Sequence, residues 1–412
     1  MNSFLQPILG SMLLFSGFWV SCFAQVNTEA TMPEGFQLPA YFQQLPSGKN
    51  HTITDVPGVR VGHVTYLKTE ALPPIATGVT AVLPTSTDAL SNTGFWAAVY
   101  SLNGNGELTG THFIQQSGLL NGPILLTNTR AVGVVFEGVH QYFEQHGKEG
   151  WASELPVVGE CWDGFFNGNP RVVRPEDVST AILNASTDPV AQGRVGAGCG
   201  MRSFELHAGI GSASRQVARA EKYYTVGVLV NTNHSVLSRL NPALKTSLEA
   251  YLSKSQHRPL SLQQLSEEDN RDVVPALKVF LKKLNENKQN EKKLNPKPDQ
   301  NSGPDAPGRQ GSIMVIIATD APLLPHQLQA LARHAGLGIG LAGGLAATHS
   351  GDLILAFSTA NAILMKGWGV EDASTLAMPV LVSEGVMNQL YAATIEAVVD
   401  AQMQAIIAAH AK

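Results

Sequence analysis

The chain has 412 residues, 44% of them hydrophobic, with a formal net charge of -5 and a pI near 6.2. A chain of this length and apolar content folds into one large globular domain or two medium ones. The weakly acidic balance excludes the strongly basic surface that binds nucleic acid or an anionic membrane, so we expect small molecules or peptides as partners.

The N-terminus has the composition of an export signal. Residues 1–24 carry no Lys, Arg, Asp or Glu, include an apolar run from 8 to 23, and end at Ala24 before polar sequence begins at Gln25. This predicts a signal peptide, residues 1–24, and an exported protein that is periplasmic or secreted. The basic start of such a signal is missing, which leaves a retained membrane anchor as the alternative.

Two cysteines, Cys161 and Cys199, remain after the predicted signal peptide is removed. They are enough for one disulfide in an oxidising compartment, but not for a disulfide framework. The sequence contains no CxxC or HExxH spacing. We therefore predict no metal site and no cofactor.

Short apolar runs separated by glycines predict strands between residues 58 and 232. The runs are 79–83, 124–126, 132–136 and 224–230. Three glycine-rich stretches, 103–106, 196–200 and 336–344, predict tight turns or close approaches of the backbone.

Helices are predicted next, at 236–252 and 272–286, the second with Pro275 in its first turn. Residues 287–310 are rich in Lys, Asn, Pro, Asp and Gly, which predicts a disordered linker. It ends at Gly311, where the apolar strand that we predict at 313–318 is about to begin.

After residue 318 the sequence predicts helices and strands in alternation. A helix is predicted at 325–334, then a glycine loop, a strand at 352–358, and a C-terminal helix with one apolar stripe from Met387 to Val399. No regular βαβ repeat runs through the chain. The order therefore predicts an α+β protein in which stacked sheets are flanked by helices.

Ser312 stands where the linker meets a buried strand. A serine there can attack the carbonyl of Gly311, break its own backbone, and emerge as a new N-terminal residue with a hydroxyl nucleophile and a free amine. Glycine before it leaves that carbonyl uncrowded. We predict a self-cleaving serine hydrolase that is cut between Gly311 and Ser312.

Two polar residues open the strand that follows. In an extended chain Ser350 and Asp352 lie on one face, where they can relay a proton from Ser312. His349 lies on the other face, which disfavours a Ser-His-Asp triad. A solvated carboxylate at the start of a strand is the alternative for Asp352.

Two further side chains are candidates for binding the substrate. Asn233 follows a predicted strand, where its amide can donate to an oxyanion, although a turn asparagine is the alternative. Glu160 ends a strand beside the aromatic ring of Trp162, a pair that can hold a substrate ammonium group.

The sequence does not support two other kinds of site, a dinucleotide-binding loop and an α/β-hydrolase elbow. Residues 338–343 satisfy GxGxxG, but a predicted helix precedes them in place of a strand, so a dinucleotide site is not predicted. No GxSxG occurs in the chain, which excludes the usual α/β-hydrolase elbow.

Several segments taken together resemble the autoprocessed serine aminopeptidases, the family of the L-aminopeptidase/D-esterase DmpA and the β-peptidyl aminopeptidases. The segments are TDVPGV (54–59), NGNGELTG (103–110), TNT (127–129), GIGSASR (209–215), and SGD (350–352) with AFSTAN (356–361). The resemblance runs from about Thr54 to the C-terminus.

The resemblance implies an αββα four-layer sandwich, similar to that of N-terminal-nucleophile hydrolases but with distinct connectivity. It also implies a single catalytic domain built from two chains, with residues 25–311 as the α chain and 312–412 as the β chain. It implies Ser312 as nucleophile, supported by Ser350 and Asp352, with Asn233 as oxyanion donor and Glu160 as the ligand of the substrate amine. Trp162 stands where the family can have a tyrosine, so no tyrosine hydroxyl is available there.

The resemblance also implies a homo-oligomer, a tetramer of processed α/β pairs, which acts on small peptides or on amino-acid amides and esters with a free amine. Two alternatives stay open. One is an acyltransferase similar to ornithine acetyltransferase, which also cleaves itself before a hydroxyl residue. The other is a non-catalytic exported binding protein.

Overall fold

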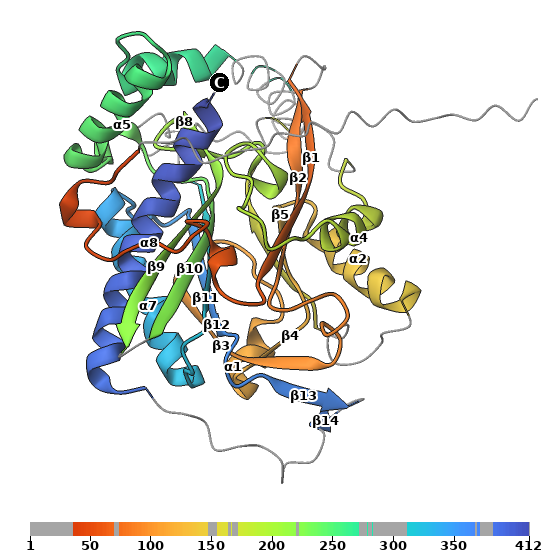
Figure 1. The fold of residues 1–412 in the computed structure, drawn as a ribbon. Helices are drawn as coiled ribbons and strands as arrows, with labels where there is room; N and C mark the ends of the chain where they lie inside the picture. The colour runs from red at the N-terminus through yellow and green to blue at the C-terminus, as the bar shows by residue number, and fades with distance from the viewer. Residues whose placement is uncertain are drawn as a thin grey trace, which may run out of the picture.

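The computed structural model describes residues 36–69, 74–146, 155–163, 166, 172–219, 222–271, 278, 282, 311–366, 369–370 and 382–411. The predicted signal peptide 1–24, the linker 287–310 and most of the predicted helix 272–286 lie outside the described residues. Within them, two stacked β-sheets carry helices on both outer faces (Figure 1).

The smaller sheet has four strands in the order β1-β2-β5-β6. Their bounds are Arg60–Lys68 (β1), Ile75–Leu83 (β2), Ile124–Asn128 (β5) and Val157–Cys161 (β6). The first three strands are antiparallel neighbours, whereas β5 and β6 are parallel. The predicted strands at 79–83 and 124–126 are thereby confirmed.

The larger sheet has the order β14-β13-β3-β12-β11-β10-β9, with β4 paired to β3 at its side. Its strands are Thr93–Gly104 (β3), Leu119–Asn121 (β4), Gly209–Arg219 (β9), Lys222–Thr232 (β10), Ile313–Thr319 (β11), Gly351–Ser358 (β12), Ile363–Lys366 (β13) and Gly369–Val370 (β14). A separate hairpin joins Arg202–Ser203 (β7) to Leu206–His207 (β8).

Three hydrophobic clusters define four layers. The inner cluster joins the facing sides of the two sheets, with Leu126 and Val157 from one and Met314 and Leu355 from the other. A second cluster packs the larger sheet against helices Pro325–Ala342 (α7) and Glu384–His410 (α8). A third packs the smaller sheet against Val132–Gln145 (α2) and Pro175–Leu183 (α4). The αββα sandwich is thus confirmed.

Strand β11 is central to the larger sheet. It is buried at all seven positions, with alternate side chains facing the inner layer and the helices α7 and α8. It runs antiparallel to β10 and parallel to β12, and the register places Ile313 opposite both Thr232 and Asp352. The residue just before β11 therefore lies beside the end of β10 and the start of β12.

Two of the predicted elements are wrong. Residues 132–136, predicted as a strand, begin helix α2, which buries Val135, Val139 and Phe143 on one face. A short apolar run does not distinguish the two structures, and only the spacing further along shows the helix. Residues 336–342, predicted as part of a glycine loop, continue helix α7; at Gly338 a Cβ would lie 2.8 Å from Val398 Cβ, so this glycine lets α7 approach α8.

The predicted helix 236–252 is divided in the structure. A 3-10 turn, Leu237–Arg239, precedes helix α5, Pro242–Ser255. The side chain of Asn241 accepts a hydrogen bond from Ala243 N–H, and the proline follows at the first helical position. This cap and proline start the helix later than the apolar pattern indicated.

Helix α8 is more deeply buried than a single apolar stripe predicts. Every residue from 396 to 407 is buried, because this half lies between the larger sheet and a satellite cluster that includes helix α5. Among the described residues α8 alone has the length and apolar composition of a membrane span. Its most apolar window is 78% buried inside the protein, as expected for a core helix.

Candidate active site

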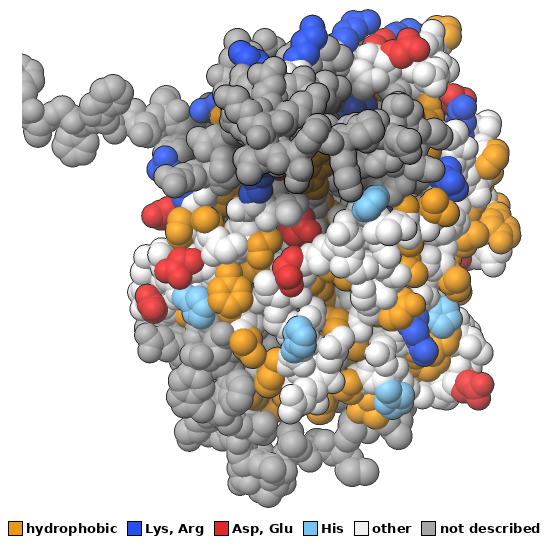
Figure 2. Space-filling view, turned by 180° about the vertical axis from the view of Figure 1, so that it is seen from behind, with side chains coloured by type: hydrophobic (Ala, Val, Ile, Leu, Met, Phe, Trp, Pro, Cys, Tyr) orange, Lys and Arg blue, Asp and Glu red, His pale blue; other side chains and the backbone are white. Residues whose placement is uncertain are grey.

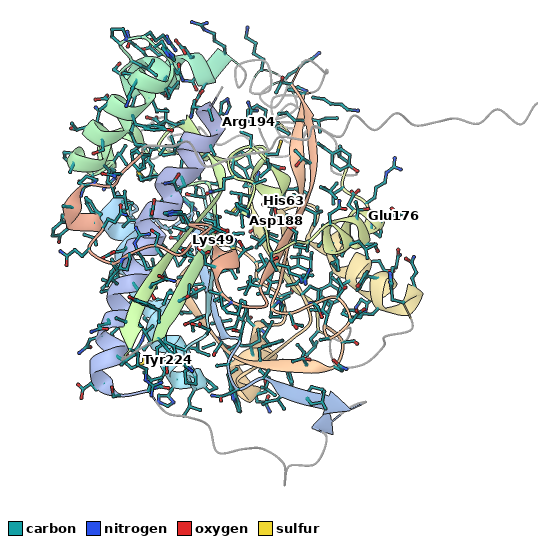
Figure 3. All side chains as sticks on the ribbon, viewed as in Figure 1. Lys49, His63, Glu176, Asp188, Arg194 and Tyr224 are labelled. Atoms are coloured by element: carbon teal, nitrogen blue, oxygen red, sulfur yellow. The ribbon has the colours of Figure 1, made fainter. Side chains whose placement is uncertain are left out.

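The predicted nucleophile, Ser312, lies directly before the first residue of β11. Ser312 is 6% exposed, and its Oγ accepts a hydrogen bond from Gly351 N–H at 3.2 Å. Its carbonyl accepts a hydrogen bond from Asn233 N–H at 2.9 Å. The site lies at the end of β10 that leads into Asn233. Tyr224, labelled in Figure 3, lies near the start of the same strand, far from the site.

Gly311 occupies a position where a side chain fits only if the neighbouring backbone moves. A Cβ added there would lie 1.7 Å from the carbonyl oxygen of Asn233. The carbonyl of Gly311 accepts a hydrogen bond from the hydroxyl of Ser350. The peptide bond before Ser312 is therefore held against two of the predicted site residues.

Ser350 and Asp352 are brought together as the alternation of an extended chain predicts. The Ser350 Oγ lies 2.6 Å from Asp352 Oδ1, and Asp352 is 1% exposed. Burial raises the pKa of Asp352 to about 6, although hydrogen bonds from Ser350 and from the Ile313 N–H oppose the shift. This carboxyl can therefore exchange a proton near neutral pH.

His349 does not join this group. Its side chain is exposed, whereas its neighbour Ser350 is 3% exposed. A Ser-His-Asp triad through His349 is therefore not formed, as the alternation of faces predicts.

Both ends of the Asn233 amide are fixed. Its Oδ1 accepts a hydrogen bond from Arg202 N–H at 2.9 Å, and its Nδ2 donates to the carbonyl of Trp162 at 2.8 Å. Asn233 is 8% exposed, and its side chain lies against Gly311, because its Nδ2 would be 2.8 Å from a Cβ at that glycine. One amide hydrogen remains for a developing oxyanion.

Glu160 lies near the end of β6 and is 4% exposed. Its Oε1 accepts a hydrogen bond from Glu107 N–H at 3.2 Å, and its Oε2 accepts one from the Thr129 hydroxyl. Burial raises the pKa of Glu160 and outweighs these two hydrogen bonds, which lower it. A bound ammonium group would favour the ionised carboxylate in this setting.

A third buried carboxyl group, Asp163, was not among the predicted site residues. It is 5% exposed, and burial raises its pKa to about 7, a shift that the hydrogen bond from Thr77 opposes. The hydroxyl of Thr77 in turn accepts a hydrogen bond from Asn128 Nδ2 at 2.7 Å. The only sequence signal was its place three residues after Glu160.

The two cysteines do not form a disulfide; both are free and buried. Cys161 packs under the site, with its Sγ 3.4 Å from the carbonyl of Asn231 and 3.6 Å from that of Ser312. In the part of the chain that the structure describes, no three His, Cys, Asp or Glu side chains are grouped to hold a metal ion.

The chain matches known proteins over most of its length. The sequence profile of peptidase family S58 matches residues 51–412. The β-peptidyl aminopeptidase BapA of Sphingosinicella microcystinivorans is 38% identical over 329 residues, 76% of this chain and 72% of the relative. That of Sphingosinicella xenopeptidilytica is 31% identical over 97% of this chain and 90% of its own.

Solved structures agree. The β-aminopeptidase of a Burkholderia species superposes with a TM-score of 0.69 and 33% identity, covering 91% of this chain and 90% of its own. The L-aminopeptidase D-Ala-esterase/amidase of Ochrobactrum anthropi, described as a variant of the Ntn hydrolase fold, gives a TM-score of 0.68 and 30% identity over 90% and 89%. The chain therefore belongs to peptidase family S58, the family of DmpA and the β-peptidyl aminopeptidases, and is an aminopeptidase.

Proposed function

We propose that this protein is an exported serine aminopeptidase that cuts its own backbone between Gly311 and Ser312. The released Ser312 then attacks peptides, amides or esters that carry a free amine. The observation that carries the proposal is the hydrogen bond from Ser350 to the carbonyl of Gly311. It polarises the bond that precedes the nucleophile, in a site where Ser312 Oγ is also held by Gly351 N–H.

Self-cleavage needs no group from outside the chain except water. Ser312 Oγ attacks the Gly311 carbonyl carbon, and the negative charge develops on the oxygen that faces the Ser350 hydroxyl. The C–N bond breaks as the Ser312 nitrogen takes up the proton lost by the hydroxyl, which leaves an ester. Water then hydrolyses the ester, giving a Gly311 carboxylate and an N-terminal Ser312.

The new amine completes the nucleophile. An α-amino group has a reference pKa of about 7.7 to 8.0, so part of it is neutral near pH 7 and can accept the hydroxyl proton. Asn233 Nδ2 donates its remaining hydrogen to the oxyanion of the substrate. Water then releases the acyl group from Ser312, and Ser350 with Asp352 relays the proton.

Glu160 and Trp162 are proposed to bind the free amine of the substrate. The carboxylate of Glu160 is buried and oriented by Thr129 and by the Glu107 main chain. The relatives are named as aminopeptidases for β-peptides and for L-amino acids, and an aminopeptidase removes the N-terminal residue, which itself carries the free amine.

Export rests on the composition of residues 1–24. We propose that the mature protein begins at Gln25 and assembles as a homo-oligomer of processed pairs. Mass spectrometry of protein secreted by the native cell tests where the mature protein begins, because an intact segment 1–24 would contradict the proposed start at Gln25.

The face in Figure 2 shows hydrophobic side chains scattered among polar atoms, with most visible Lys and Arg in its upper part.

Replacing the nucleophile tests the proposed function. Wild-type protein should separate on a denaturing gel into two chains, and N-terminal sequencing of the smaller should start at Ser312. Ser312→Ala should remain one chain without aminopeptidase activity. His349→Ala is the matched control and should be cut and active. A Ser312→Ala protein that is still split before residue 312, or that still turns over substrate, would overturn the proposal.

A further inference from the structure

The segment 103–107, at the end of β3, connects the two halves of the site. At one end, Asn103 Nδ2 donates hydrogen bonds to the carbonyl of Ser350 and, at 2.7 Å, to that of Ala347. Asn105 N–H donates to the same Ser350 carbonyl at 3.3 Å. Both hydrogens of the Asn103 amide are thereby used to hold the loop that carries Ser350.

The other end of this segment holds the predicted amine ligand. Glu107 N–H donates to Glu160 Oε1 at 3.2 Å. Gly106 lies between the two halves, since a Cβ there would be 3.1 Å from Gly351 Cα and 3.3 Å from Glu160 Oε1. Segment 103–107 therefore sets the spacing between Ser350 and Glu160.

The loop that Asn103 holds also has a hydrogen bond of its own, from Ser350 N–H to the carbonyl of Ala347 at 2.7 Å. It joins α7 to β12 and contains Ala346 at a φ of 49°, a left-handed conformation that costs a non-glycine residue free energy. The pairing of β3 with β12 is irregular here, because Asp352 faces Asn103 whereas Leu353 faces Ser101. Irregular pairing of this kind is a β-bulge, and β-bulges are frequent beside active sites, where they redirect side chains.

We propose that Asn103 is a positioning residue for the reaction at Ser312. Its amide fixes the loop 347–350, so that the Ser350 hydroxyl meets the Gly311 carbonyl during self-cleavage and the nucleophile during turnover. This inference rests on the proposed function. It assigns Asn103 an effect on the rate of the chemistry, and leaves amine binding to Glu160, whose hydrogen bonds to Glu107 N–H and the Thr129 hydroxyl do not involve the Asn103 side chain.

Three variants test the role of the amide donor. Asn103→Ala removes it, and Asn103→Asp keeps the size but places an acceptor against two carbonyl oxygens. Asn105→Ala is the matched control, because Asn105 is exposed and contacts Ser350 through its main-chain N–H. Each variant is compared with wild type in its rate of self-cleavage, its kcat and KM, and its melting temperature.

Both Asn103 variants should be cut at least about tenfold more slowly and should have kcat lowered by a similar factor, because small displacements of a reacting group are costly. KM should stay within about twofold, since binding energy is not lost. The introduced carboxyl of Asn103→Asp donates a hydrogen bond again when protonated, so its kcat relative to wild type should rise as the pH falls. Asn105→Ala should match wild type in every readout.

Other outcomes overturn the inference. Asn103→Asp with wild-type rates would show that the side chain only fills space, and a rise in KM without a fall in kcat would place Asn103 in binding. If Asn103→Ala is insoluble, Asn103→Asp, which has the same size, decides. Failure of the proposed function itself is seen separately, because then wild-type protein is not cut before Ser312.

Discussion

The hydroxyl of Ser350 lies 2.6 Å from Oδ1 of Asp352 and also contacts the carbonyl of Gly311. A hydroxyl has one hydrogen, so it donates to only one of these oxygens at a time. When it donates to Gly311 it polarises the carbonyl of the bond that we propose is cut. When it donates to the ionised carboxylate it is ready to pass a proton on. The protonation state of Asp352 therefore affects whether Ser350 donates to the Gly311 carbonyl or to the carboxylate.

The first prediction concerns the pH dependence of turnover. The ionised form of Asp352 accepts a proton through Ser350, and its pKa is raised to about 6 by burial. Wild-type kcat should therefore rise with pH through about 6, in addition to a rise near 8 from the Ser312 amine. In Asp352→Asn the limb near pH 6 should disappear, with kcat lowered about 100-fold or more. An unchanged limb would assign it to another group.

The second prediction concerns the substrate amine. Glu160→Gln removes a charge that would pair with ammonium, so KM for free-amine substrates should rise about tenfold or more. Substrates with an acetylated amine should be poor for both proteins and lose little further. Glu107→Gln is the control, because that residue holds Glu160 through its main chain. Equal losses on the two kinds of substrate would contradict amine anchoring.

The third prediction concerns the residue before the cut. In Gly311→Ala the new methyl would lie 1.7 Å from the Asn233 carbonyl oxygen, so one of these segments must move. The two chains should then appear on a denaturing gel at least about tenfold more slowly than in wild type. A Cβ at Gly385 would meet no atom within 4 Å, so Gly385→Ala should be cut at the wild-type rate. Equal rates for both variants would refute the steric argument.

The fourth prediction concerns stability. Burial raises the pKa of Asp163 to about 7 in the folded protein, above its ordinary value near 3.8. The folded state therefore binds this proton more tightly, and the resulting stabilisation is complete below pH about 4 and lost as the pH rises to about 7. Asp163→Asn should consequently gain stability relative to its parent as the pH rises, by at most on the order of 4 kcal/mol.

Thermal melting in a Ser312→Ala background measures this difference, because both proteins should then be single chains. Thr77 can keep its hydrogen bond to the carbonyl oxygen of the introduced amide. A difference in melting temperature that is constant from pH 4 to pH 8 would show that Asp163 has an ordinary pKa.

Local periodicity was enough to predict one part of the site. Ser350 and Asp352 are two residues apart at the start of a strand, and a period of two places them on one face. The strand at 313–318 was equally clear, because its apolar run is short and follows a polar segment. These features depend on neighbours in the chain, so the sequence alone contains them.

The residues that were missed depend on partners far away in the chain. Thr129 holds Glu160 from 31 positions earlier, and Asn103 holds Ser350 across 247 positions. Nothing in the local sequence of Asn103 or Asp163 shows which groups they will face. The segments NGNGE and TNT were informative only as parts of a resemblance, without a stated role.

The strand order of the larger sheet affects how the protein folds and refolds. Strands β11 and β12 lie between β3 and β10, and α8 carries Glu396 and Asp400, which bind the fully buried Arg215 of β9. If the backbone is cut before Ser312 as proposed, strands from two polypeptides alternate in one sheet, and neither polypeptide can complete the sheet alone. The sheet would then form in the intact precursor, and refolding of the cut protein would be a bimolecular reaction whose yield depends on concentration.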